Sequence, residues 1–252
     1  MIFTCKPELE DILTSIYDAW EWALLNGHDK VNFQFEPVEQ YSFLEEYRHI
    51  DGNYEKTQKV IRSIQKKISY SAYEFVYYVT LSAQPDMVKV IYDFLRIGFR
   101  EGPKVVNMYT EPAVIRMMEI KKNVSNEIMR FTEFMRITSM DKRIYVGHIE
   151  PKCNVIYPVA VYFVDRMPSE NWMIVDDNRK TAVIHPKNQK IFVRYLNDDE
   201  FEGLKITDSY KDEYSEMWKV FFNTIAIRER TNEQCQMNHF PLWTRKHITE
   251  FN

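Results

Sequence analysis

The sequence predicts an α+β protein, and three observations support this fold class. Strand and helix patterns alternate over residues 1–51, helical periodicity dominates residues 54–136, and strand patterns return after residue 137. We therefore expect a small β-α-β N-terminal part, a helical middle, and a C-terminal antiparallel sheet packed by a long helix. The composition change predicts an N-terminal region of residues 1–136 and a C-terminal α+β module of residues 137–252, which together could form one compact unit.

The β-α-β opening is predicted from two kinds of periodicity. Apolar residues recur at helical spacing between Leu9 and Leu24, and Gly27 is expected to end that helix. Val31, Phe33 and Phe35 alternate with polar residues, as side chains do in a strand. Residues 2–5 and 47–51 are further strand candidates, so this region contains up to three strands around one helix.

The remaining elements follow from helix periodicity and turn residues. Four helices are expected over residues 54–136 and another over 155–164, whereas 144–149 is a predicted strand. Residues 172–175 and 181–184 flank a polar turn and predict a β-hairpin, with a further strand near 191–195. An acidic loop is expected over residues 197–208. The last long helix is expected to bury Tyr214, Met217, Trp218, Phe221 and Ile225.

Composition limits the possible functions. The 252 residues include 45% hydrophobic and 15% aromatic residues, enough for a large core. The formal net charge is −4, so a broad DNA binder that relies on global charge is excluded, and nucleic-acid binding would need a local basic patch.

The cysteines and the apolar segments predict a cytoplasmic protein. The three cysteines are scattered and odd in number, which argues against a disulfide framework and for a reducing compartment. The N-terminus has no basic leader followed by an apolar core, and no apolar run approaches the length of a membrane span. We therefore expect no signal peptide and no membrane partner.

No recognised metal or cofactor motif is present. The six histidines include no i, i+4 pair and no accompanying cysteine spacing, which a zinc site usually has. Neither a metal nor a cofactor is therefore predicted.

Two basic stretches are candidates for nucleic-acid binding. In the first, Lys59, Arg62 and Lys66 share one helix face, which could follow phosphates or could be an ordinary solvated face. The second combines cations with interleaved aromatic residues, as a single-strand groove does, although lysines on an edge strand also prevent aggregation. Its candidate binding residues are Arg179, Lys187, Lys190 and Arg194.

Polar residues in the C-terminal half are the other site candidates. Glu150 and Asp176 could act as general acid and base if they lie together, but Asp176-Asp177-Asn178 is also typical of a hairpin turn. Arg166 and Trp172 are candidate pocket residues. The last candidate set is Arg230, Asn232 and Gln236. Arginine suits phosphate, and Asn and Gln can bind base edges. Helix capping is the alternative role for this set.

Several segments carry a resemblance to a known bacterial family. They are I-Q-K-K-I-S-Y-S-A-Y (residues 64–73), I-Y-V-G-H-I-E-P (144–151), F-V-D-R (163–166), N-W-M-I-V-D-D-N-R (171–179) and I-R-E-R-T-N-E-Q-C-Q (227–236). Over nearly its whole length the chain resembles bacterial proteins assigned to DNA metabolism or DNA repair, whose biochemical activity is unknown. Tyr162 departs from the family pattern, which commonly has histidine there, so histidine-dependent chemistry is not expected at that position.

The resemblance implies DNA and a radical-SAM protein as partners. Members of the family are typically encoded beside a radical-SAM protein, and their C-terminal module also occurs fused to uracil-DNA-glycosylase-like domains. The main hypothesis is therefore a nucleic-acid-associated protein of DNA repair or processing. The alternatives are a stand-alone enzyme acting on a damaged nucleotide or a phosphorylated small molecule, and a partner-binding scaffold.

Overall fold

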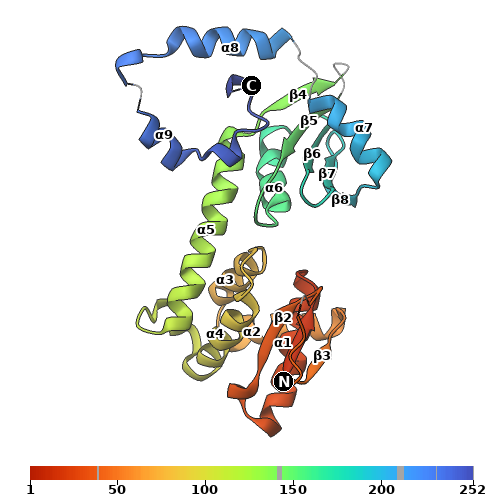
Figure 1. Cartoon of the computed structure of the whole chain (residues 1–252), viewed down its shortest axis with the longest axis vertical. Coiled ribbons are helices and arrows are strands. Elements are labelled where there is room, and N and C mark those ends of the chain that lie inside the picture. The colour runs from red at the N-terminus through yellow and green to blue at the C-terminus, as the bar shows by residue number, and fades with distance from the viewer. Residues whose placement is uncertain (39, 141–143, 209–212, 231, 252) are drawn as a thin grey trace. The chain divides into compact units, whose positions relative to one another are not determined.

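The computed structural model confirms the α+β class (Figure 1). It describes residues 1–38, 40–140, 144–208, 213–230 and 232–251. The chain divides into two compact units, Met1–Ser125 and Asn126–Asn252, and the division lies within helix α5 (Pro112–Phe134). The composition change at residue 137 coincides with the start of strand β4 (Ile137–Met140).

The first unit begins with the predicted β-α-β arrangement. Strands β1 (Ile2–Cys5), β2 (Asn32–Phe35) and β3 (Tyr47–His49) form a parallel sheet in the order β2-β1-β3. Helix α1 (Leu9–Asn26) is followed by Gly27, whose φ of 96° lies in the left-handed region that glycine adopts without strain. A 3₁₀ turn, η1 (His28–Lys30), leads into β2. In β1, burial raises the pKa of the Cys5 thiol to about 12, which keeps it protonated and unreactive.

Three further helices contribute to the core of the first unit, together with the first part of α5. They are α2 (Tyr54–Lys67), α3 (Tyr70–Thr80) and α4 (Met87–Glu101), followed by the 3₁₀ helix η2 (Gly102–Asn107). Asn53 and Ser69 accept hydrogen bonds from the backbone amides of Lys56 and Ala72, so each caps the start of its helix. The predicted helical middle is thus confirmed.

The second unit is built on a five-stranded sheet. Its order is β4-β5-β6-β7-β8, with strands β5 (Ile144–Ile149), β6 (Trp172–Asp176), β7 (Thr181–His185) and β8 (Phe192–Tyr195). The predicted hairpin is present as β6 and β7. Strands β5 and β6 are parallel and are joined by helix α6 (Ile156–Arg166), so the sheet is mostly but not entirely antiparallel.

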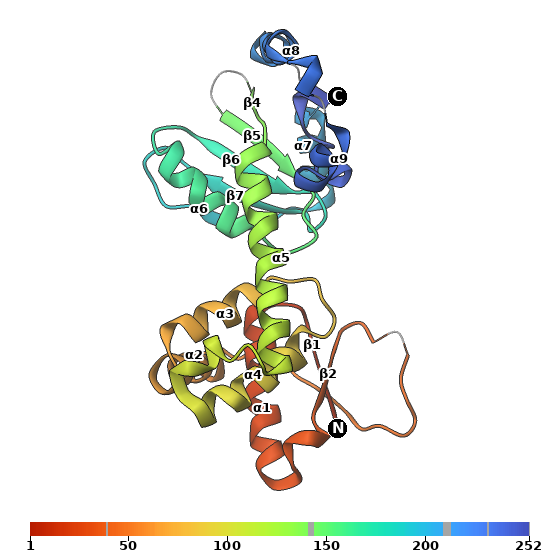
Figure 2. The ribbon, with the colours of Figure 1, turned by 90° about the vertical axis from the view of Figure 1, so that its left-hand side faces the viewer.

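Helices α6 and α7 (Asp198–Asp208) cover opposite faces of this sheet (Figure 2). Phe201 of α7 packs in a buried cluster with Val146, Val175 and Ala182. On the other face, Phe163 of α6 lies edge-on against Trp172, with ring centroids 6.3 Å apart. The sheet therefore has two apolar faces, one packed by α6 and the other by α7.

The prediction of an acidic loop over residues 197–208 is wrong, because this segment forms helix α7. Asn197 accepts a hydrogen bond from the Glu200 amide at 2.8 Å, and Glu200 accepts one from the Asn197 amide at 3.1 Å. This reciprocal pair is a capping box, which starts a helix despite the acidic composition. Leu204 lies on the same side of the helix as Phe201 and packs against the same cluster.

The long helix expected to pack on the sheet is α8 (Glu213–Ile225), and its predicted buried stripe is wrong. Met217 is 65% exposed and Phe221 is 50% exposed. The reason is that α7 already covers the sheet face that α8 would need. The remaining elements are η3 (Arg228–Arg230), α9 (Glu233–His239), η4 (Leu242–Thr244) and η5 (Thr249–Phe251).

Among the described residues, no helix combines the length and the apolar character needed to cross a membrane. This agrees with the absence of a long apolar run in the sequence.

We predict that Phe201→Ala lowers the free energy of unfolding of the second unit by about 3 kcal/mol. The substitution removes the ring that α7 contributes to the buried cluster. Urea denaturation followed by tryptophan fluorescence measures the change. Tyr195→Ala, which replaces an exposed aromatic residue on β8, is the matched control and should have little effect. A Phe201 variant as stable as the control would contradict the packing of α7.

Candidate functional site

Polar side chains gather where the two parallel strands of the second unit end. His148 lies near the end of β5 and Glu150 directly follows that strand, whereas Asp176 ends β6 and Asp177 follows it. The strands are paired with Ile149 opposite Asp176, so their carboxyl ends lie at the same edge. In open sheets, ligands bind outside the carboxyl ends of parallel strands. This edge of the sheet is therefore a candidate ligand-binding site.

His148 and Asp177 form a close pair at this edge. Alternate residues of a strand face opposite sides, so His148 shares the face of Val146 and Asp177 that of Val175. Nδ1 of His148 lies 2.8 Å from Oδ1 of Asp177, and His148 is buried. The Asp177 amide donates to the Ile149 carbonyl at 3.0 Å, which fixes the backbone that carries the carboxylate.

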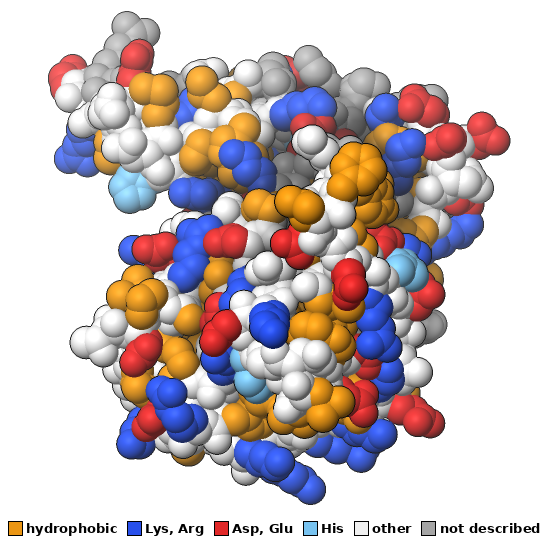
Figure 3. Space-filling view, turned by 60° about the horizontal axis from the view of Figure 1, so that its bottom comes forward, with side chains coloured by type: hydrophobic (Ala, Val, Ile, Leu, Met, Phe, Trp, Pro, Cys, Tyr) orange, Lys and Arg blue, Asp and Glu red, His pale blue; other side chains and the backbone are white. Residues whose placement is uncertain are grey.

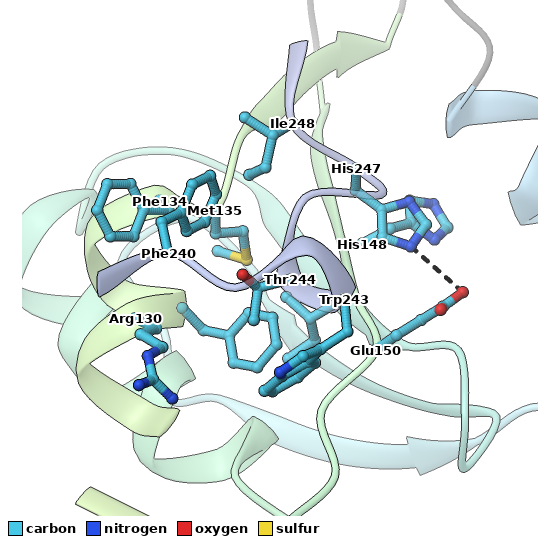
Figure 4. Close-up of a pocket in the computed structure, with 12 residues that line it drawn as sticks. Arg130, Phe134, Met135, His148, Glu150, Phe240, Trp243, Thr244, His247 and Ile248 are labelled. Carbon is cyan, nitrogen blue, oxygen red and sulfur yellow. Dashed lines mark ion pairs between the residues drawn. The ribbon is translucent and has the colours of Figure 1, made fainter. Parts of the chain in front are cut away.

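The C-terminal segment brings His247 to this edge of the sheet, beside Glu150 (Figure 4). Nε2 of His247 lies 3.5 Å from Oε1 of Glu150. The same atom lies 3.6 Å from Oδ2 of Asp177. The rings of His148 and His247 lie beside each other, with centroids 5.8 Å apart. Lys246 donates to Glu150. We call His148, Glu150, Asp177 and His247 the His–carboxylate cluster.

Apolar contacts hold the C-terminal segment against the rest of this unit. The ring of Phe240 packs on Phe134 at the end of α5, with centroids 4.2 Å apart, and Ile248 is buried. Arg136 forms an ion pair with Glu250. His247 is thus positioned by contacts on both sides of it in the chain.

The cavity beneath the cluster is too small for a substrate. Its volume is about 10 Å³, roughly the space of one water molecule. Most of its lining is apolar, including Phe131, Met135 and Phe240. Substrate chemistry at the cluster would therefore take place on its solvent side.

Basic residues lie near the chain segments that carry the cluster. Arg179 donates to the carbonyls of Pro151 and Lys152 at 3.0 and 2.6 Å and so holds the segment that follows Glu150. Lys152 is exposed and its Nζ lies 4.8 Å from the ring centroid of Trp243. Arg130 lines the cavity. The cluster itself combines two carboxylates and two imidazoles.

Of the two predicted carboxylates, Glu150 belongs to the cluster and Asp176 belongs to a turn. Asp176 accepts hydrogen bonds from the amides of Asn178 and Arg179 and from the Arg179 guanidinium at 2.9 Å. Burial raises the pKa of Asp176, and the neighbouring Arg179 partly offsets this effect. The carboxylate that reaches the cluster is the adjacent Asp177.

Arg166 and Trp172, the predicted pocket residues, lie away from the cluster. Trp172 starts β6, at the strand end opposite Asp177, and its buried ring stacks on His185 with centroids 4.8 Å apart. Arg166 donates to the hydroxyl of Tyr162 within α6. Trp172 is therefore part of the core, and Arg166 lies on the surface of α6.

The last predicted set lies around the start of α9. Asn232 accepts a hydrogen bond from the Cys235 amide at 2.9 Å and so caps that helix. Helix capping is the alternative role expected for this set. Gln236 and Arg230 are exposed. This segment lies outside the His–carboxylate cluster.

The second basic stretch is partly used within the fold. Arg179 is bound as described, and Arg194 forms an ion pair with Glu200. Lys187 and Lys190 are exposed in the connection between β7 and β8. Phe192 and Tyr195 on β8 are also exposed, so cations and rings share this part of the surface.

The first basic stretch borders a groove in the first unit. The groove has a volume of about 470 Å³ and is lined by Tyr17, Trp20, Leu24, Lys59, Lys67 and Phe99, among others. Nζ of Lys59 lies 5.9 Å from the ring centroid of Tyr17. Arg62 and Lys66 are exposed elsewhere on α2. In Figure 3, basic and acidic side chains are interspersed on the visible face, so any basic site is local.

Comparison with known families covers the second unit and the end of the first. Residues 85–250, more than half of the chain, match DUF4130, a domain of unknown function. The chain belongs to this family. A search of the curated proteins gave no match. All members of the His–carboxylate cluster lie within the DUF4130 region, whereas Tyr17, Trp20 and Lys59 of the groove lie before it.

We predict that Asp176→Ala lowers the free energy of unfolding by about 2 kcal/mol. The substitution removes the side-chain acceptor of two turn amides and one of the acceptors of the Arg179 guanidinium. Thermal denaturation measures the effect, and Asp165→Ala, which removes an exposed carboxylate on α6, is the control. Equal stability of the two variants would contradict a structural role for Asp176.

Proposed function

We propose that this DUF4130 protein is a cytoplasmic, nucleic-acid-associated protein of DNA metabolism or repair. The family match supports membership of a family of unknown function, and the assignment to DNA rests on the resemblance described above together with one local surface. That surface is the groove of the first unit, where lysines and aromatic rings lie together.

The chemistry of the groove suits a flexible single strand. Its volume of about 470 Å³ lies in the range of small-molecule sites, so it can hold a base with its sugar. Single-strand sites stack bases on aromatic rings and follow phosphates with cations. Tyr17 and Trp20 would supply the rings, and Lys59 and Lys67 the cations.

The exposed Lys187 and Lys190 support a second contact with the nucleic-acid backbone. They lie beside exposed Phe192 and Tyr195, which again combines charge with rings. Phosphate contacts of this kind position a protein without selecting sequence. We therefore propose strand binding rather than recognition of a base sequence.

An enzyme acting on a damaged nucleotide or a phosphorylated small molecule is the second candidate. The His–carboxylate cluster favours it, because His148 bonded to Asp177 is an arrangement suited to proton transfer.

The radical-SAM protein is proposed as a partner from the resemblance alone. Mixing the two purified proteins and measuring their co-elution by size-exclusion chromatography tests this partner.

We predict that the double variant Lys59→Glu/Lys67→Glu binds a short fluorescent single-stranded DNA about tenfold more weakly than the unmodified chain. Fluorescence anisotropy at several salt concentrations measures the Kd, and the salt slope should fall by about 1 for each phosphate that the variant no longer binds. The cause is removal of the two cations that border the groove.

Lys104→Glu/Lys122→Glu, which replaces two exposed lysines that do not line the groove, is the matched control and should bind normally. An equal loss of affinity in this control would point to net charge rather than the groove. Absence of binding by the unmodified chain at low salt would overturn the nucleic-acid proposal.

A further inference from the structure

We propose that Glu150, Asp177 and His247 form a binding site for one divalent transition-metal ion, such as Zn²⁺ or Mn²⁺. One ligand atom from each side chain lies within 4.8 Å of the others. Two carboxylate oxygens and an imidazole nitrogen are ligands that such ions accept. Ion binding at this site does not depend on nucleic-acid binding by the groove.

The two separations between His247 and the carboxylates fit a shared ion. Two ligands that are each about 2.1 Å from an ion, at a tetrahedral angle, lie about 3.4 Å apart. Nε2 of His247 lies 3.5 Å from Oε1 of Glu150 and 3.6 Å from Oδ2 of Asp177. These separations are longer than the usual hydrogen-bond range of about 2.7 to 3.2 Å.

His148 orients one of the ligands. It is hydrogen-bonded to Oδ1 of Asp177, and Oδ2 is the oxygen that faces His247. Hydrogen bonds to ligating carboxylates commonly set their orientation in metal sites. His148 is therefore a positioning residue in this proposal, and the buried imidazole need not contact the ion.

Lys246 competes with the ion for Glu150. Its ammonium donates to Oε1 of Glu150, the same oxygen that lies near His247. Without an ion, this contact reduces the electrostatic repulsion between the carboxylates of Glu150 and Asp177, which both lie near the imidazole of His247. Ion binding would displace the ammonium, so Lys246 is expected to lower the affinity of the site.

Three protein ligands leave at least one position of the ion for water or a substrate oxygen. This is the pattern of catalytic rather than structural zinc sites, which have four protein ligands. An oxygen atom of water or of a substrate is the kind of ligand that the open position would accept.

Isothermal titration of the chelator-treated full chain with Zn²⁺ and with Mn²⁺ tests the proposal. We expect one ion per chain, and an affinity about tenfold or more weaker in each of Glu150→Gln, Asp177→Asn and His247→Ala. Lys246→Gln should bind more tightly than the unmodified chain. Asp165→Asn, which neutralises an exposed carboxylate on α6, should bind as the unmodified chain does.

The proposal is overturned if the chain binds neither ion, or if the three ligand variants bind as tightly as Asp165→Asn. Circular dichroism verifies that each variant is folded. Glu150 and Lys246 are on the solvent side of the cluster, so the opposite effects of Glu150→Gln and Lys246→Gln decide the question even if His247→Ala fails to fold.

Discussion

The parallel pairing of β5 and β6 is the constraint on which the candidate site depends. It sets Ile149 opposite Asp176, so the residues that follow both strands emerge at one edge of the sheet. If the two strands were antiparallel, as the hairpins around them are, Glu150 and Asp177 would lie at opposite ends of the sheet. The crossover helix α6 makes the parallel arrangement possible, because parallel neighbours need a long connection.

The His–carboxylate cluster also depends on the C-terminal segment. Packing of Phe240 on Phe134 and burial of Ile248 hold that segment where His247 reaches both carboxylates. Asp176 and Arg179 make a separate contribution, because they fix the turn that carries Asp177 and the segment that follows Glu150. Residues without a chemical role thus determine the geometry of those that have one.

The two surfaces proposed for function differ in their relation to the family. The cluster lies wholly within the DUF4130 region, whereas most residues of the aromatic and basic groove precede it. The groove is expected to be a property of the N-terminal unit, which would add a binding function to the chemistry of the cluster.

Periodicity and turn residues are local signals, and they were enough to predict the α+β class, the β-α-β opening, the helical middle and the β6–β7 hairpin. Residue type and position also marked Glu150 as a candidate. The folded chain was needed to show that Asp177 rather than Asp176 joins Glu150, that His148 and His247 meet them, and that α7 rather than α8 covers the sheet. Strand direction and the path of the C-terminal segment make these choices, and both depend on contacts between residues far apart in the chain, which no local pattern records.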